Sequence, residues 1–343
     1  MVGKYRNKNI KIQEEVKEML YPLRFEKVFI EKVWGGREFE KSLNMSLPEK
    51  VNIGESWEVS AHPNGMSIIE NGPLKGRTLQ DVYDEYKGKL TGEKVYKEYK
   101  EKFPLLIKYL DVNDRLSIQV HPDDKVALEK HNELGKSESW FIMEASDDAT
   151  LIMGMKEGIT REEFLRKAKK NDFTGLFEEI KVKKGDLIDI TPGMVHASLS
   201  GSVLFAEIQE NSDITYRIYD FDRVESNGKK RELHLDEAAD VIDFNKKAVV
   251  INTDFSGKER RKTIIRKKYY SIDKVKIDEE MEDISKGSMI IYSILEGSGE
   301  LIFKNEKGED ESLKIKKGES LLIPPHIPLT VKGTFEILRT IIE

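Results

Sequence analysis

Four side chains of this 343-residue chain could together bind one divalent cation. Gln119 offers an amide oxygen, His121 and His196 offer imidazole nitrogens, and Glu138 offers a carboxylate. A mixed nitrogen and oxygen set of this kind suits Zn²⁺, with Mn²⁺, Fe²⁺, Co²⁺ and Ni²⁺ as alternatives. Because such a set leaves room for water or substrate on the ion, it is typical of a catalytic site and not of a structural one.

The first two of these residues lie in a stretch of strict alternation, Ser117-Ile118-Gln119-Val120-His121. Alternate side chains of a β-strand share one face, so the serine, the glutamine and the histidine would point the same way. The two aliphatic residues would then pack behind them. A solvated strand face is the ordinary interpretation of such a pattern alone, but the carboxylate and the second histidine farther along the chain favour a site.

Other residue types narrow the choice of ligands. The chain has no cysteine, which excludes disulfides and thiolate ligands. His131 is the main competing histidine, and it lies in a helix-like run, KVALEKHNELGK, where we expect it on the surface. We therefore expect any metal to be held by imidazole, carboxylate and amide groups.

Composition sets the class of protein and its partners. Apolar residues make up 38% of the chain and charged residues 35%, and the formal net charge is −6 with both signs interspersed. We find no basic block of the kind that binds nucleic acid. The first 20 residues lack the apolar core of a signal peptide, and no window approaches about 18 apolar residues. We expect a cytoplasmic protein, monomer or homodimer, that binds neither nucleic acid nor membrane.

Short β-like runs separated by turn residues fill most of the chain after a polar N-terminal extension, residues 1–23. Helical patterns interrupt them at about 78–102, 160–179 (including a short helix in TGLFEEI) and 231–244. The strings KKGDLIDITPGMVH (183–196) and KKGESLLIPPHIP (316–328) form a weak internal repeat. The repeat predicts two small β-barrels, at 24–247 and 248–343.

Five strings in the first part of the chain closely resemble the type I mannose-6-phosphate isomerases, zinc enzymes of the cupin superfamily. They are GESW (54–57), PLLIK (104–108), LSIQVHPDD (116–124), GKSESW (135–140) and TPGMVH (191–196). A sixth string, SDITYRIYDFDR (212–223), resembles the shorter bacterial branch. The resemblance implies a mainly β fold of two cupin-type, jelly-roll-like barrels. The first would be catalytic and contain a helical insertion, and the second would be metal-free.

The resemblance also implies roles for individual residues. It puts one Zn²⁺ per chain at the four ligands named above, and Arg217 near the reacting carbons. Ser117 and Arg223 fall where the family holds the substrate phosphate. The longer, eukaryote-like members have a lysine at the position of Arg223, and a guanidinium there keeps the charge and could bind phosphate through two hydrogen bonds. Lys136 and Glu55 match catalytic cleft positions, and Trp34 matches a substrate-binding one.

The implied reaction interconverts mannose 6-phosphate and fructose 6-phosphate through a cis-enediol. It needs a group that carries a proton between C1 and C2, and the sequence leaves Glu207, Glu55, His62 and a metal-bound water as alternatives. Two other functions remain open at this stage. One is a cupin dioxygenase with redox-active iron, and the other is a non-catalytic sugar-binding or regulatory barrel.

Overall fold

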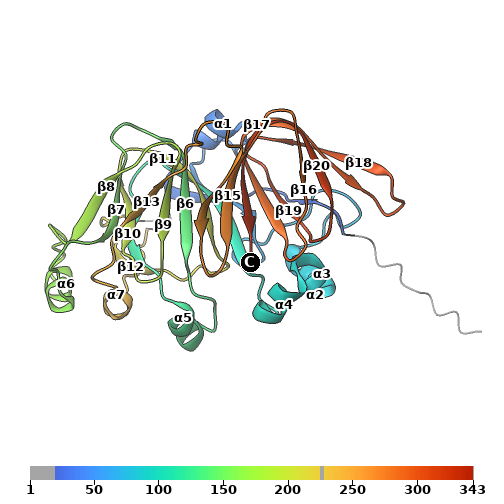
Figure 1. Ribbon diagram of the computed structural model, residues 1–343. Helices are drawn as coiled ribbons and strands as arrows, with labels where there is room; N and C mark the ends of the chain where they lie inside the picture. Colours follow the sequence, from blue (N-terminus) through green and yellow to red (C-terminus); the bar gives the residue numbers. More distant parts are fainter. Residues whose placement is uncertain (1–19, 225–227, 343) are drawn as a thin grey trace, which may run out of the picture.

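The computed structural model describes residues 20–224 and 228–342 and consists mainly of antiparallel β-strands in three sheets (Figure 1). This confirms the mainly β class. The sheets are open, with edge strands such as β8 (Phe177–Lys181) and β2 (Val28–Gly36), so the expectation of closed barrels is wrong. Residues 1–19 of the expected N-terminal extension lie outside the described residues. No described helix has both the length and the apolar character needed to cross a bilayer.

A seven-stranded sheet forms the centre of the molecule. Its strands run in the spatial order β13 (Val249–Asn252), β9 (Asp186–Ile190), β6 (Glu138–Ala145), β11 (Val203–Glu210), β4 (Leu105–Val112), β3 (Ile53–Val59) and β2. The inner strands are buried on both faces, which explains continuous apolar runs such as the one in β4. The expected domain boundary at 247/248 falls just ahead of β13, which pairs with β9 in this sheet.

A five-stranded sheet packs on one face of the seven-stranded sheet. Its order is β12 (Tyr216–Tyr219), β5 (Ile118–Val120), β10 (His196–Ser200), β7 (Thr150–Met155) and β8. The core between the two sheets includes Trp34, Trp140 and Phe205. On its outer face the five-stranded sheet packs against α6 (Arg161–Ala168) and α7 (Leu235–Val241). The candidate metal ligands lie at one end of the interior of this sandwich.

An eight-stranded sheet covers the other face of the seven-stranded sheet (Figure 1). It contains β1 (Leu23–Arg24), β14 (Arg261–Arg266), β15 (Ser271–Ile277), β16 (Glu280–Asp283), β17 (Ile290–Lys304), β18 (Asp310–Lys316), β19 (Ser320–Ile323) and β20 (Leu329–Ile341). Leu23 is fully buried and pairs with Leu322 of β19, so the chain just before residue 24 belongs to the C-terminal sheet.

The helices fall in or near the segments where helical patterns occur. Residues 78–102 contain α2 (Leu79–Tyr86), α3 (Gly88–Thr91) and α4 (Glu93–Tyr99), and Thr78 caps α2 by accepting from the N–H of Asp81. Two more short helices are α1 (Glu38–Leu43) and α5 (Asp124–His131). The short helix expected in TGLFEEI is wrong, because its second half forms β8. There Phe177 turns inward at an edge of the five-stranded sheet while the following glutamates stay exposed.

Candidate active site

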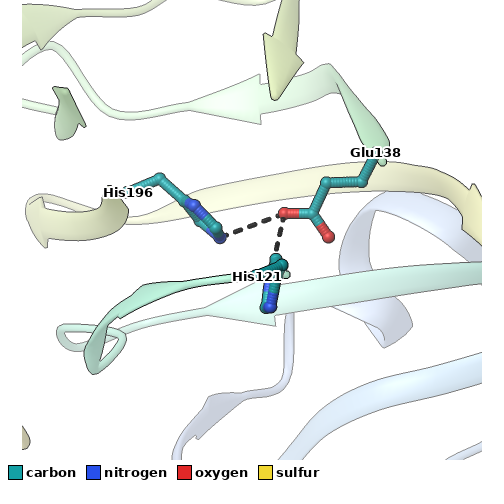
Figure 2. A group of neighbouring side chains, drawn as sticks. All are labelled: His121, Glu138 and His196. Atoms are coloured by element: carbon teal, nitrogen blue, oxygen red, sulfur yellow. Dashed lines mark ion pairs between the residues drawn. The ribbon is translucent and has the colours of Figure 1, made fainter. Parts of the chain in front are cut away.

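Three of the expected metal ligands converge at one end of the sandwich interior. His196 begins β10 and lies directly opposite Gln119 of β5 in the antiparallel register, while His121 directly follows β5. Glu138 begins β6 in the facing sheet. Figure 2 shows both histidine rings directed toward the carboxylate of Glu138. The two faces of residues 117–121 lie as the alternation predicts. Ile118 and Val120 pack on the helices, and the polar residues face inward.

The distances within this group are those of a compact cluster. The Nε2 atom of His196 lies 3.0 Å from Oε1 of Glu138, and the Nε2 atom of His121 lies 3.6 Å from the same oxygen (Figure 2). One donor atom from each of the three residues lies within 4.8 Å of the other two. All three side chains are buried, with at most 1% exposure.

The chain fixes the tautomer of each histidine. The Nδ1 atom of His121 lies 2.8 Å from the carbonyl oxygen of Ile214, and the Nδ1 atom of His196 lies 2.9 Å from that of Met194. Since a carbonyl only accepts, both Nδ1 atoms carry the proton and both Nε2 atoms present lone pairs to the cluster. The turn that contains Gly193, at φ +85°, is joined to His121, because the N–H of Gly193 donates to the backbone carbonyl of His121.

This arrangement fits a metal ion. Among the described residues, the Nε2 atom of His121 and both carboxylate oxygens of Glu138 are buried without a hydrogen-bond partner, although the Lys136 ammonium lies 3.3 Å from one of these oxygens. Buried polar atoms normally have partners, and a cation would satisfy all three. Burial, together with the nearby Lys136 ammonium, lowers the pKa of His121 to about 3, so it stays in the neutral form that binds metal.

Gln119 lies beside this cluster, with its amide Nε2 3.3 Å from Nε2 of His196 and its Oε1 accepting from Ser117. The two amide atoms exchange places by a half-turn of the terminal torsion, which would direct the oxygen toward a cation. Gln119 is therefore close enough to serve as the fourth ligand. The described residues bring together all four members of the expected set.

The Lys136 ammonium keeps Glu138 ionised. Burial opposes ionisation, but Lys136 outweighs it and holds the pKa of Glu138 well below its usual range. The Nζ atom of Lys136 lies 3.3 Å from Oε2 of Glu138. The neighbouring Glu207 responds in the opposite way: burial and the charge of Glu138 raise its pKa to about 8, against the opposing effect of Lys136 and Lys108.

A cavity of about 250 Å³ opens next to the cluster. Ser117, Gln119, Trp34 and Trp140 belong to its lining. Its basic side chains are Lys32, Lys108, Lys136, Arg217 and Arg231, and its acidic ones are Glu55, Glu207 and Asp213. Because basic groups outnumber acidic ones, the lining suits a polar ligand that carries negative charge.

Comparison with known proteins identifies the family. Residues 23–139 match the model of the type I phosphomannose isomerase catalytic domain, and residues 260–342 match that of the mannose-6-phosphate isomerase cupin domain. The chain is 34% identical to the mannose-6-phosphate isomerase of Streptococcus mutans over 307 residues, which covers 89% of this chain and 93% of that protein. This chain belongs to the type I mannose-6-phosphate isomerase family. Bacillus subtilis ManA, also named a mannose-6-phosphate isomerase, is 34% identical over 88% of this chain and 93% of its own length.

Solved structures of the family share the whole architecture. The mannose 6-phosphate isomerase crystal structure from Bacillus subtilis superposes with a TM-score of 0.84 at 35% identity, covering 94% of this chain and 100% of that one. A phosphomannose isomerase from Salmonella typhimurium has the same fold, with a TM-score of 0.73 at 18% identity. The similarity therefore extends over both halves of this family member.

Most site residues expected from the sequence line the cavity of this type I family member. Glu55 and Trp34 come from β3 and β2, and Arg217 comes from β12, where its Nε donates to Ser117 Oγ at 3.3 Å. Arg223 does not line the cavity. Its guanidinium pairs with Asp220 at 2.6 Å and donates to the carbonyl of Arg115.

Four charged residues of the lining had no role assigned from the sequence. Lys32 stands two residues before Trp34 on the same strand, and Lys108 ends the PLLIK string, so alternation along these strands could have indicated both. Asp213 falls in the family-like string at 212–223. No local sequence pattern indicates the position of Arg231.

Two other histidines considered from the sequence, His131 and His62, do not join the three-residue cluster. His131 ends α5, is exposed, and bonds to the hydroxyl of Tyr216 at 2.8 Å, as expected of a surface residue. His62, an alternative proton carrier, accepts a hydrogen bond at Nδ1 from the N–H of Asn64. Burial lowers its pKa, against the opposing effect of Asp213.

Proposed function

We propose that this chain interconverts mannose 6-phosphate and fructose 6-phosphate. Membership of the type I isomerase family supports the reaction. One structural observation carries the proposal to this site: buried ligand atoms without partners stand next to a cavity that also presents guanidinium groups. An aldose phosphate needs both features, one near its carbonyl end and one near its phosphate.

The proposed cofactor is one Zn²⁺ held by Gln119, His121, Glu138 and His196. The donor set of two imidazoles, one carboxylate and one amide favours this ion among the common divalent cations. When bound, Zn²⁺ supplies a Lewis acid that stabilises negative charge developing on the substrate oxygens. Lys136 stays close to Glu138 and adds a second positive charge at the same end of the cavity.

Glu207 is the proposed proton carrier. The reaction moves the C2 proton to C1, which one group facing both carbons can carry, and transfers the O2 hydroxyl proton to the neighbouring O1. Glu207 lines the cavity, and the indole N–H of Trp140 donates to its Oε1 at 2.9 Å. Its Oε2 stays 3.9 Å from the Lys108 ammonium, which is beyond hydrogen-bond distance.

Other acid–base candidates are less well placed. Both oxygens of Glu55 are occupied, one by the indole N–H of Trp57 at 2.8 Å and the other by the Lys32 ammonium at 3.0 Å. Its pKa is lowered because Lys108 and Lys32 outweigh the effect of burial. His62 does not belong to the cavity lining. These contacts favour Glu207 as the carrier and an orienting role for Glu55.

The phosphate would bind at the guanidinium end of the cavity. Ser117 and Arg217 are hydrogen-bonded to each other there, and Arg231 completes a group of one hydroxyl and two guanidinium side chains. Guanidinium groups bind phosphate through paired, charge-assisted hydrogen bonds. Because Arg231 lines the cavity and Arg223 does not, Arg231 is the proposed phosphate ligand and Arg223 a support behind it.

One assay tests the proposal. The purified protein is incubated with mannose 6-phosphate, with and without a metal chelator, and fructose 6-phosphate is measured. Product that disappears with chelator and returns with added Zn²⁺ supports the isomerase. Oxygen consumption without isomerisation would instead indicate a dioxygenase, and binding without turnover a sugar sensor; the family match favours neither. A cytoplasmic location and a monomeric or dimeric state stay predictions.

A further inference from the structure

A four-residue turn of the C-terminal half contacts the strands that carry the proposed metal ligands. Residues 267–270, Lys-Lys-Tyr-Tyr, connect β14 to β15, and the N–H of Lys267 closes the turn on the carbonyl of Tyr270 at 2.9 Å. All four side chains make hydrogen bonds to the N-terminal half of the molecule. Each of these hydrogen bonds ends on a segment that carries a proposed site residue. A contact that only held the two halves together would not need to end there.

Lys267 reaches the metal ligand itself. Its ammonium donates to the carbonyl oxygen of Glu138 at 2.9 Å, to Oδ1 of Asp189 at 2.6 Å and to the carbonyl of Ile190 at 3.3 Å. An ammonium has three N–H donors, so all of them are used. The side chain is 7% exposed, and few other donors could replace it.

These acceptors lie where two strands approach the cluster. Glu138 and Ile190 are direct partners in the register between β6 and β9, and Lys267 joins their carbonyls at the end of that ladder. The chain leaves β9 at Ile190 and reaches His196 through the turn that contains Gly193. Lys267 therefore fixes the strand ends from which two of the proposed ligands emerge.

Tyr270 makes hydrogen bonds one residue farther along the same sheet. Its hydroxyl donates to the carbonyl of Ile208 at 2.8 Å and lies 3.0 Å from Oγ of Ser139. These two residues are partners in the register between β6 and β11 and directly follow Glu138 and Glu207. The Tyr270 side chain is almost fully buried.

The middle two residues of the turn contact the segment after His121. The ammonium of Lys268 and the hydroxyl of Tyr269 both donate to Oδ2 of Asp124, each at 2.8 Å. The other oxygen of Asp124 accepts from the N–H of Gly135 at 3.3 Å, just before Lys136. The turn is thus linked through Asp124 to the segment after His121 and to the residue before Lys136.

We propose that the turn at residues 267–270 is a positioning element for the metal site, with Lys267 setting the placement of Glu138. The C-terminal half then contributes to the chemistry of the N-terminal half without entering the cavity. Groups that orient metal ligands from outside the coordination shell commonly affect metal affinity by about 10- to 100-fold when they are removed. This inference rests on the proposed metal site and extends it to a segment far from the other site residues in sequence.

Lys267→Met tests the inference, because methionine keeps most of the length of the side chain and removes its three donors. The full-length protein is stripped of metal, and Zn²⁺ is titrated in competition with a chromophoric chelator. We expect the Zn²⁺ dissociation constant to rise about 10- to 100-fold. The absorption bands of the Co²⁺-loaded protein should also shift, because they report the ligand geometry directly.

Lys274→Met is the matched control. Lys274 is a buried lysine of the same half, on β15, and its ammonium faces Glu336 and the ring of Phe141, three residues beyond Glu138 on β6. It should bind Zn²⁺ like the wild type. Should Lys267→Met fail to fold, Tyr270→Phe, which loses only one hydroxyl, should still raise the dissociation constant several-fold.

The outcomes separate the two proposals. Wild-type protein that binds no Zn²⁺ would overturn the metal site itself. Wild-type binding with an unchanged dissociation constant and Co²⁺ spectrum in both Lys267→Met and Tyr270→Phe would overturn the positioning role alone. An equal loss of affinity in Lys274→Met would also overturn it, because the effect would then reflect the loss of any buried lysine.

Discussion

Glu207 and Trp140 face each other across neighbouring strands, and the indole N–H of Trp140 holds one oxygen of the glutamate at 2.9 Å. Both side chains are buried, and Trp140 also stacks on Phe205 with ring centroids 4.3 Å apart. The tryptophan therefore has little freedom to move, and it fixes the carboxyl group on the wall of the cavity. A carboxyl group held in place on the cavity wall is what proton transfer between adjacent carbons requires.

Glu207→Gln should lower kcat by about 100- to 10,000-fold while leaving Zn²⁺ content unchanged. The amide oxygen of glutamine can still accept from Trp140, so the shape of the wall is kept and only the ability to carry a proton is lost. Steady-state kinetics with mannose 6-phosphate, combined with metal analysis, check this. Glu55→Gln is the comparison; if it abolished turnover while Glu207→Gln remained active, Glu55 would be the carrier.

His121→Ala and Glu138→Ala should each lose the bound metal. Every ligand supplies part of the binding free energy, and among the described residues the Nε2 atom of His121 and the carboxylate oxygens of Glu138 have no hydrogen-bond partner. Metal content after dialysis measures the effect. His131→Ala, which removes an exposed histidine, should keep the wild-type content. Full zinc occupancy in both ligand variants would contradict the assignment.

Local patterns predicted the mainly β class and the inward-facing residues of one strand, but not how the sheets pack. Alternation along residues 117–121 places three polar groups on one face, and this face is the one that lines the cavity, because Ile118 and Val120 have a hydrophobic layer of helices to pack against. The family-like strings supplied Glu138 and His196. Their meeting depends on the packing of two sheets, which no short stretch encodes.

Long-range packing explains what the sequence did not indicate. The strand β8 arises because Phe177 finds a place in the core of the five-stranded sheet, which overrides the helical character of its glutamates. Leu23 pairs with a strand some 300 residues away, and Lys267 bonds to Glu138 across the two halves. Such contacts follow from the assembled fold, and periodicity over a few residues carries no signal for them.

Arg217→Ala should keep its metal and lose turnover by orders of magnitude. The guanidinium lines the cavity and donates to Ser117 Oγ and to the carbonyl of Glu232, so we expect its removal to leave the Zn²⁺ dissociation constant unchanged. A charge that stabilises the transition state affects kcat more than binding. Kinetics and metal analysis on the same preparation test both halves of the prediction, and a near-normal kcat would remove Arg217 from the mechanism.

The stability of the C-terminal sheet should depend on Asp283. This buried carboxylate accepts from Arg339 Nε at 2.6 Å and Nη2 at 3.1 Å, and from the hydroxyl of Tyr292. Burial opposes its ionisation, but Arg339 and Tyr292 outweigh it and lower the pKa below the usual 3.8. Removing one partner of a buried pair costs about 3–5 kcal/mol, so Asp283→Asn should lower the melting temperature at pH 7.

The pH dependence of this effect has a definite sign. Because the folded-state pKa of Asp283 lies below the unfolded value, its contribution is fully present above about pH 4 and is lost as the pH falls through the folded pKa. The difference in melting temperature between wild type and Asp283→Asn should therefore be constant near neutral pH and narrow in acid. A difference that grows toward low pH would contradict the ion-pair account.

Arg231→Ala should raise KM for mannose 6-phosphate by about 10- to 100-fold, because a hydrogen bond to a charged group contributes about 1.5–3 kcal/mol. Arg223→Ala is the matched control: both arginines pair with Asp220, yet only Arg231 lines the cavity. The rate with unphosphorylated mannose, measured beside the phosphorylated sugar, distinguishes phosphate binding from general damage. We expect Arg231→Ala to lose its preference for the phosphorylated sugar and Arg223→Ala to keep most of it. The reverse pattern would assign the phosphate to Arg223, as the family resemblance alone implies.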